Sequence, residues 1–305
     1  MNLKQYKSHF SEQLSSIYPQ IEIDTFFFFL IEEYLGLQRI DLVMQPNFEI
    51  PSEKQVILNE ALSRLQKEEP IQYILGKTEF YGFPFKVTSN TLIPRPETEE
   101  LVEWILKEVD TNKKLNIIDI GTGTGCIPIS LKKHLPNSVV SAVDVSKEAL
   151  KIAQQNAVLN EATINFVEQD ILKIDDLNVI ANNVKQSLCN NEITSSDAPR
   201  NDVKFDVIVS NPPYVRNLEK VEIKNNVLQN EPHLALFVED DDPLIFYNKI
   251  ADLAKKHLSE QGLLFFEINQ YLGKQTVEML KNKGFAKVEL RKDLFGNDRM
   301  IKASL

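Results

Sequence analysis

Short apolar runs alternate with amphipathic stretches along the chain from residue 96 onward. The runs are rich in Ile, Val, Leu and Phe, as expected for buried strands, and they cover residues 116–120, 139–143, 164–167, 205–210, 262–268, 285–290 and 299–303. Helical spacing of apolar residues marks stretches that begin near residues 96, 126, 146, 244 and 275. Strands that alternate with helices form a mostly parallel sheet covered on both faces. The pattern predicts an α/β fold with a doubly wound, seven-stranded, mostly parallel sheet.

The first 75 residues show helical spacing, few glycines and no strand-like alternation. One apolar series advances by three or four residues per step: Leu3, Tyr6, Phe10, Leu14 and Ile17. A second apolar segment covers residues 26–37, and Ser52 is placed to cap a third helix. We therefore predict a small all-α helical bundle over residues 1–75.

Two other segments depart from these patterns. Residues 76–95 combine β-prone aromatic residues with turn residues, which predicts a β-hairpin linking the bundle to an α/β domain over residues 96–305. The stretch at about 175–203 is rich in Asn, Ser and Asp. We predict that it is a polar insertion, partly disordered and tolerated as a surface loop.

Composition narrows the class of protein. The 305 residues are 43% apolar and 26% charged, as in a globular protein, and the net charge is −10. Binding to nucleic acid relies on Lys and Arg to neutralise phosphates, so we expect no direct sequence-specific nucleic-acid partner. No stretch has the pattern of a signal peptide or a membrane span, and the two cysteines form neither a disulfide framework nor a metal site. We expect a cytoplasmic protein without a metal.

A glycine-rich turn follows the predicted strand at residues 116–120. The turn reads Gly121-Thr122-Gly123-Thr124-Gly125, and Asp119 lies two residues before its first glycine. Glycines at such a turn let a ligand approach the backbone, because no Cβ intervenes. The next predicted strand ends in Asp144, 19 residues after Gly125, which is the spacing of an acid that binds a ribose diol.

A second motif, Asn211-Pro212-Pro213-Tyr214, follows the predicted strand at residues 205–210. The Asn amide offers a donor and an acceptor, and each proline fixes its own φ. The Tyr ring offers a flat apolar wall. Together these groups suit a planar NH2 group, either the exocyclic amine of a base or a side-chain amide.

The two motifs resemble those of class I S-adenosylmethionine-dependent methyltransferases, whose sheet is Rossmann-like. A third segment, Pro94-Arg95-Pro96-Glu97-Thr98-Glu99, resembles one found in the peptide chain release factor N5-glutamine methyltransferases. The resemblance extends to residues 70–76, to Glu231-Pro232 and to the closing residues 293–299. It implies methyl transfer from S-adenosylmethionine to the glutamine of the Gly-Gly-Gln loop of a release factor, with S-adenosylhomocysteine as product. The helical bundle would then be the docking domain for that protein.

The resemblance also implies roles for individual residues. The catalytic and substrate-binding residues would be Asn211, Pro212, Pro213 and Tyr214. The cofactor would contact Asn211 and a second set consisting of Asp119, Gly121, Thr122, Gly123, Thr124, Gly125, Asp144, Asp170 and Ile171. Relatives often place an aromatic or apolar residue beside the adenine, where this chain has Ile171. Arg95 and Glu97 either order the lip of the pocket or begin a helix. Asn269 stands where relatives often have Gly, which puts a tight turn there in doubt.

The residues leave other targets open. A glutamine of a ribosomal protein would require the same chemistry. A DNA adenine N6-methyltransferase shares the Asn-Pro-Pro-Tyr motif but would need to flip a base and to track DNA on a basic surface. An RNA guanine N2-methyltransferase meets the same objection from the charge of −10. A cofactor-binding module without activity would predict a damaged motif, and this motif is intact.

Overall fold

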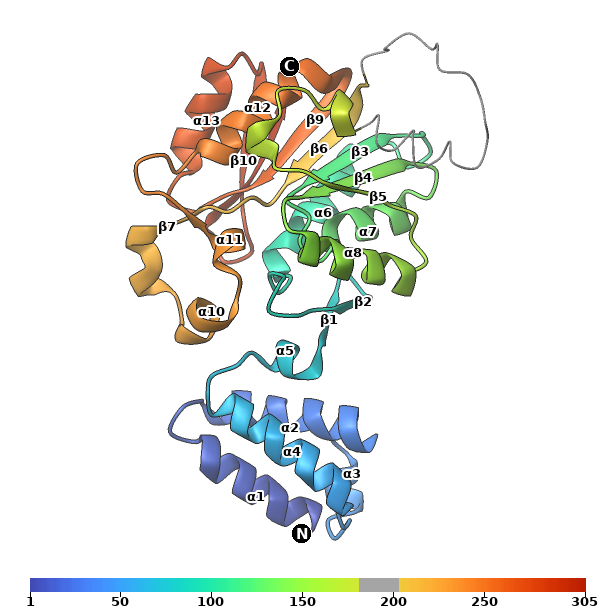
Figure 1. Ribbon diagram of the computed structural model, residues 1–305, viewed down its shortest axis with the longest axis vertical. Coiled ribbons are helices and arrows are strands. Elements are labelled where there is room, and N and C mark those ends of the chain that lie inside the picture. Colours follow the sequence, from blue (N-terminus) through green and yellow to red (C-terminus); the bar gives the residue numbers. More distant parts are fainter. Residues whose placement is uncertain (181–202) are drawn as a thin grey trace. The chain divides into compact units, whose positions relative to one another are not determined.

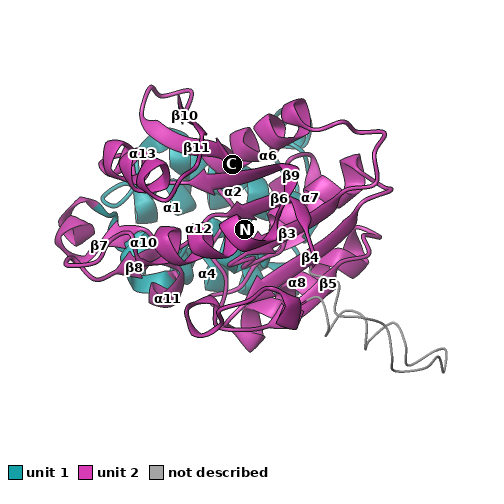
Figure 2. Ribbon diagram, turned by 90° about the horizontal axis from the view of Figure 1, so that it is seen from above, with its two compact units in different colours: residues 1–77, 223–230 teal, residues 78–222, 231–305 magenta. Residues whose placement is uncertain are grey.

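The computed structural model describes residues 1–180 and 203–305, which divide into two units. One unit contains residues 1–77 and 223–230, and the other contains residues 78–222 and 231–305 (Figure 2). Most of the predicted polar insertion, residues 181–202, lies outside the described residues. Among the described residues, no helix is both long and apolar enough to cross a bilayer.

The larger unit is built on one seven-stranded sheet with the order β10-β11-β9-β6-β3-β4-β5 (Figure 1). Its strands are β3 (Asn116–Ile120), β4 (Val139–Asp144), β5 (Asn165–Glu168), β6 (Phe205–Ser210), β9 (Leu258–Glu267), β10 (Lys287–Lys292) and β11 (Asp298–Ser304). Five strands are parallel, from β9 through β6, β3 and β4 to β5, and β11 pairs antiparallel with both β9 and β10. The predicted doubly wound, mostly parallel sheet is therefore confirmed.

Helices cover both faces of this sheet. On one face pack α6 (Pro96–Glu108), α7 (Cys126–His134) and α8 (Lys147–Leu159), and on the other pack α12 (Ile245–His257) and α13 (Gly273–Asn282). Alternate residues of β3 point to opposite faces of the sheet. Ile117 therefore packs in the core beneath α6, α7 and α8, and Ile118 packs in the core beneath α12 and α13. After β3 the chain adds β4 and then β5 on one side of β3 in the sheet, and it then crosses back to add β6 on the other side of β3. Ligands of such sheets bind at the carboxyl ends of the strands where the direction reverses.

Shorter elements follow β5 and β6. They are the 3-10 helices η1 (Ile171–Lys173) and η2 (Asn217–Glu222), the strands β7 (Val215–Arg216) and β8 (Phe237–Val238), and the helix α11 (His233–Leu236). β7 and β8 pair in parallel, so the chain just after the Asn-Pro-Pro-Tyr motif is held by the chain just after α11.

The predicted hairpin is formed by β1 (Lys77–Phe80) and β2 (Phe83–Lys86). Its two-residue turn places both Tyr81 and Gly82 at positive φ, 52° and 77°, as such turns require. Two acids of α6 hold Tyr81 there: Glu99 accepts from its backbone N–H at 2.7 Å, and Glu103 accepts from its hydroxyl.

The smaller unit is a bundle of helices with its own core. It contains α1 (Leu3–Leu14), α2 (Gln20–Leu35), α3 (Asp41–Met44), α4 (Ser52–Leu65), α5 (Ile71–Leu75) and α10 (Asn225–Asn230). Two details differ from the sequence prediction. Ile17 lies beyond the end of α1 and is 38% exposed, so it does not join the core. Ser52 is the first residue of α4 and not its cap, because Pro51 takes the capping position.

His257, the last residue of α12, holds the chain on both sides of residues 181–202. Its Nε2 accepts from the Leu177 backbone N–H at 3.2 Å, and its Nδ1 lies 3.0 Å from the Val203 carbonyl oxygen. The tautomer with its proton on Nδ1 satisfies both bonds, and Asp176 Oδ1 also lies 3.2 Å from Nε2. Leu177 and the nearby Ile180 are fully buried in the core of the larger unit.

Candidate active site

The glycine-rich loop joins β3 to α7 at the carboxyl edge of the sheet. Its three glycines, Gly121, Gly123 and Gly125, adopt φ of 78°, 54° and 79°, which side chains with a Cβ rarely tolerate. The loop is tied to the neighbouring strand because the N–H groups of Gly121 and Thr122 both donate to the Val143 carbonyl, at 2.8 and 3.0 Å. The loop backbone is thus rigid and open toward a ligand.

Gly125 has a different role from Gly123. A Cβ on Gly125 would lie 3.1 Å from Ile129 Cδ1 and 3.2 Å from Ala153 Cβ, whereas a Cβ on Gly123 would meet nothing within 4 Å. Gly125 therefore permits α7 to pack closely against α8, and Gly123 leaves open space above the loop.

Asp144 joins the end of β4 to the glycine-rich loop. One carboxylate oxygen accepts from the Gly123 N–H and the other from the Ser146 N–H, each at 2.8 Å. Burial raises the pKa of Asp144, and these backbone N–H groups oppose the rise. The Ser146 hydroxyl caps α8 by accepting from the Ala149 N–H, near the start that the sequence pattern predicts for this helix. Both oxygens keep lone pairs that can accept from a ligand's hydroxyl groups.

Asp119 lies beneath the loop and not on the cavity surface. It is fully buried, and among the described residues neither of its oxygens has a hydrogen-bond partner. Burial raises the pKa of Asp119 to about 7, and the nearby Thr122 hydroxyl opposes the rise without meeting hydrogen-bond geometry. A buried acid without a partner is costly unless it is protonated or acquires a cationic partner.

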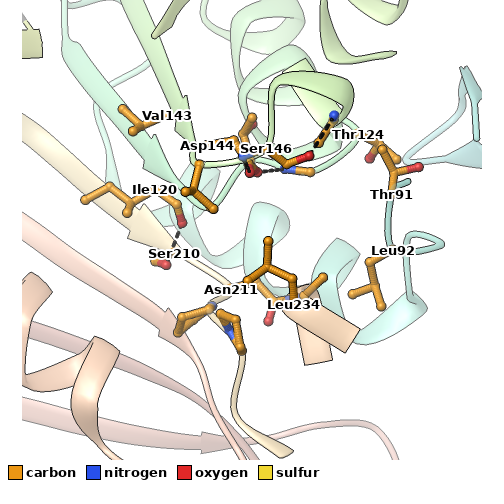
Figure 3. Close-up of a pocket in the computed structure, with 18 of the residues that line it drawn as sticks. Thr91, Leu92, Ile120, Thr124, Val143, Asp144, Ser146, Ser210, Asn211 and Leu234 are labelled. Carbon is orange, nitrogen blue, oxygen red and sulfur yellow. Dashed lines mark hydrogen bonds between the residues drawn. The ribbon is translucent and has the colours of Figure 1, made fainter. Parts of the chain in front are cut away.

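The clamp, which we define as Asn211-Pro212-Pro213, follows β6 directly. The Ser210 hydroxyl anchors its base by donating to the Ile120 carbonyl at 2.6 Å, which ties β6 to β3 (Figure 3). The Asn211 side-chain nitrogen donates to the Thr98 hydroxyl oxygen at 3.3 Å. Within the described residues, the Asn211 side-chain oxygen has no donor. The clamp thus presents an unused acceptor next to the loop.

Tyr214 lies behind the clamp. Its hydroxyl donates to Glu267 at 3.1 Å, and its backbone carbonyl accepts from the Asn269 amide at 2.9 Å. Burial raises the pKa of the Tyr214 hydroxyl far above its usual range. The Tyr214 ring, the predicted apolar wall, is half-buried and packs against the core formed with α12 and α13.

One cavity brings the loop and the clamp together. Figure 3 shows Asp144 and Ser146 on one side of it and Asn211 with Leu234 on another. The predicted residues that line it are Gly121, Thr122, Gly123, Thr124, Asp144, Asp170, Ile171, Asn211, Pro212 and Pro213. Three predicted residues are not among its lining: Asp119, Gly125 and Tyr214.

The Pro94-Arg95-Pro96-Glu97-Thr98 segment supplies another wall of the cavity. Arg95 and Thr98 line it, and Glu97 does not. Arg95 forms an ion pair with Glu231, whose other oxygen accepts from the Ile93 N–H at 3.3 Å. The Glu231 side chain is only 1% exposed, so this pair fixes the segment against the chain that precedes α11.

Sequence reasoning did not identify several residues of the site. Leu234 and Phe246 line the cavity, but an apolar residue in a predicted helix or loop carries no signal of its own. Glu267 did carry a sequence signal, because it is an acid at the end of an apolar run that predicts a buried strand. A buried acid needs partners. Asn269 is not at positive φ; its side chain instead bonds the backbone of Tyr214 and the Glu219 carboxylate.

Comparison with known proteins agrees with this geometry. The sequence profile of the PrmC N-terminal domain matches residues 7–76, and that of the methyltransferase small domain matches residues 98–183. The chain is 52% identical over 307 aligned residues to a release factor glutamine methyltransferase of Flavobacterium psychrophilum, covering 100% of this chain and 99% of the relative. A protein of the same name from Bacteroides thetaiotaomicron is 40% identical, with 97% and 98% covered.

A likeness to a solved structure supports the fold. The hMettl16 catalytic domain, solved in complex with the MAT2A 3'UTR hairpin 6, is similar with a TM-score of 0.51 and 17% identity. The similarity covers 84% of this chain and 83% of that one.

Proposed function

This chain belongs to the release factor glutamine methyltransferase family, and from that premise we propose its reaction. It transfers a methyl group from S-adenosylmethionine to the side-chain amide nitrogen, N5, of the glutamine in the Gly-Gly-Gln motif of a peptide chain release factor. The N–CH3 bond forms as the S–CH3 bond breaks, and the alkylated nitrogen then releases one proton, so the products are the N5-methylated glutamine, S-adenosylhomocysteine and a proton. The observation that carries the proposal is a single cavity bounded by the glycine-rich loop, Asp144 and the clamp.

The cofactor half of the cavity fits S-adenosylmethionine. Asp144 can accept from the two ribose hydroxyls, while Asp170 and Ile171 offer a polar and an apolar contact for the adenine. The open backbone of Gly121 and Gly123 leaves room for the methionine part. Asp119 lacks a hydrogen-bond partner among the described residues and lies beneath the loop, so it suits an ammonium group that it reaches through water. When bound, S-adenosylmethionine supplies an electrophilic methyl group, and no metal is required.

The clamp positions the amide that receives the methyl group. An amide nitrogen is a weak nucleophile, because its lone pair is delocalised into the carbonyl. The Asn211 side-chain oxygen and the Pro212 carbonyl accept the two N–H protons of the substrate amide, which raises electron density on nitrogen and aims its lone pair. Each such bond contributes only about 0.5–1.5 kcal/mol to net binding. Correct orientation of two reactants can lower the barrier by roughly 7–11 kcal/mol. Geometry is therefore the main source of catalysis.

The protein partner is a release factor, and the helical unit serves as the docking module. The chain carries a net charge of −10, which favours a partner with basic character over DNA or RNA. A substrate that acts in translation places the reaction in the cytoplasm, away from the membrane.

Transfer of an isotope-labelled methyl group tests the proposal. The purified protein is incubated with labelled S-adenosylmethionine and a release factor, either wild type or with its Gly-Gly-Gln glutamine changed to Ala. Label on the wild-type factor alone supports the proposal. A parallel reaction with unmethylated DNA is the control for the shared Asn-Pro-Pro-Tyr motif, and label on DNA alone would refute the assignment.

A further inference from the structure

Glu267 ends β9 at the centre of a buried chain of hydrogen bonds that leads to the clamp. One of its carboxylate oxygens accepts from the Thr98 hydroxyl at 2.6 Å, and the other accepts from the Tyr214 hydroxyl at 3.1 Å. Glu267 is 1% exposed and Thr98 is 3% exposed, so water does not compete for these bonds. The Tyr247 hydroxyl donates to the Glu267 backbone carbonyl at 3.1 Å and holds the end of the strand.

The number of protons available to this series of hydrogen bonds decides which group donates in each of them. Two oxygens 2.6 Å apart, as in Thr98 and Glu267, need a proton between them, and the Thr98 hydroxyl supplies it when Glu267 is a carboxylate. Burial raises the pKa of Glu267, but the two hydroxyl groups that donate to it and the Arg299 guanidinium favour the carboxylate. The Thr98 proton is committed to Glu267, so the Thr98 oxygen presents a lone pair on its other side. Asn211 meets this lone pair at 3.3 Å and must therefore turn its NH2 group toward Thr98.

We propose that Glu267 is a positioning residue that sets the orientation of the Asn211 amide through the Thr98 hydroxyl. With the NH2 group held by Thr98, the Asn211 oxygen is the group left to face the substrate. The reversed amide would present N–H donors to a substrate amide that also presents N–H donors, and the two would repel. This inference rests on the proposed function, because it assigns a purpose to the acceptor that a glutamine amide requires.

Thr98 offers a matched pair of variants. Thr98→Val keeps the shape of the side chain and removes the hydroxyl, and Thr98→Ser keeps the hydroxyl. We expect Thr98→Val to lower kcat by about tenfold or more, the size of one lost hydrogen bond at a reacting group. KM for the release factor and Kd for the cofactor should stay within about twofold, since the amide orientation matters most in the transition state. Thr98→Ser should recover most of the turnover.

A double-mutant cycle separates positioning from general support of the fold. If Thr98 acts through Asn211, Thr98→Val should add nothing to the loss caused by Asn211→Ala, because the group to be oriented is already absent. Additive losses would overturn the proposal. Glu267 is tested by Glu267→Gln, which keeps an oxygen to accept from Thr98, and by Glu267→Leu, which does not. The Gln variant should be at least several-fold faster than the Leu variant, and equal loss in both would also overturn it.

A spectroscopic measurement decides the proposal without relying on methyl transfer. The side-chain NH2 resonances of Asn211 are identified in a ¹⁵N spectrum by their loss in Asn211→Ala. They should shift in Thr98→Val and in Glu267→Leu and stay nearly in place in Thr98→Ser. Unchanged resonances in Thr98→Val would refute the relay, whether or not the wild-type protein methylates a release factor. Failure of the wild-type reaction with the expected shifts would instead refute only the proposed function.

Discussion

Asp144 and Gly123 are joined by a 2.8 Å hydrogen bond between a carboxylate oxygen and a backbone N–H. The bond connects the end of β4 to the loop that follows β3, so the acid and the glycines form one rigid unit. The second carboxylate oxygen is held in the same way by the Ser146 N–H. The direction of the acid is therefore set before a ligand arrives, which lowers the entropy that binding has to overcome.

Asp144→Asn should weaken cofactor binding more than its small change in shape suggests. In an Asn side chain an NH2 group replaces one of the two oxygens that would accept from the ribose hydroxyls, and that NH2 group also faces the Gly123 or the Ser146 N–H. Losing such an acceptor costs about 1–3 kcal/mol of binding free energy, which corresponds to roughly a 5–150-fold rise in Kd. Calorimetric titration with S-adenosylhomocysteine measures the change. Glu148→Gln, at a side chain that is 55% exposed, is the control and should bind normally.

Gly125→Ala and Gly123→Ala should distinguish a glycine needed for the packing of α7 on α8 from a glycine needed for cofactor binding. Both impose a Cβ at positive φ, but only the Cβ at position 125 would press on Ile129 and Ala153. Gly125→Ala should therefore lower the free energy of unfolding by about 1–3 kcal/mol more than Gly123→Ala. Gly123→Ala should chiefly weaken cofactor binding. Urea unfolding of the two variants measures the difference, and equal losses of stability would contradict the assignment.

The buried carboxyl of Asp119 should make stability depend on pH. Its ordinary pKa is 3.8, and burial raises it to about 7 in the folded protein. Between these values the folded state holds a proton that the unfolded state releases, so the free energy of unfolding falls as pH rises. Over that window the contribution is roughly 4 kcal/mol, from about 1.4 kcal/mol per pKa unit.

Asp119→Asn supplies the comparison, because the amide has nearly the same shape and does not titrate. Urea unfolding without ligand at pH 4.5, 6 and 8 should show the wild type losing stability relative to the variant as pH rises. Parallel curves would show that Asp119 does not titrate in this range. Cofactor binding supplies a second readout: an ammonium that meets Asp119 would make affinity rise between pH 6 and 8 in the wild type only.

Asn211→Ala should lower turnover by about 10² or more, by analogy with the loss of one aligned hydrogen-bonding group at a reacting centre. Cofactor affinity should change far less, because the glycine-rich loop and Asp144 are intact. Steady-state methylation of a release factor and calorimetric titration of the cofactor measure the two effects. Near wild-type turnover would mean that Asn211 does not position the amide.

The sheet was predictable because its strands are apolar runs separated by helical spacing, and both signals are local. The glycine-rich loop and Asp144 were predictable for the same reason, since their spacing in sequence reflects one strand-turn-helix-strand unit. The bond between Thr98 and Glu267 was not, because 169 residues separate the two and no local pattern pairs them. The direction of Tyr214 also depends on a distant partner, and its hydroxyl bonds Glu267 instead of facing the cavity.

The imidazole of His257 holds two points that are distant along the chain. Leu177 and Val203 both bond this one ring, so both positions are held at the end of α12. Closing a chain segment between fixed ends depends only weakly on its length, since each doubling of the number of residues adds about 0.6 kcal/mol. Because Ile180 is buried in the core, a change of length placed after it and before Val203 should leave the sheet, the cavity and the clamp unchanged. The same place suits the insertion of a tag or a reporter domain.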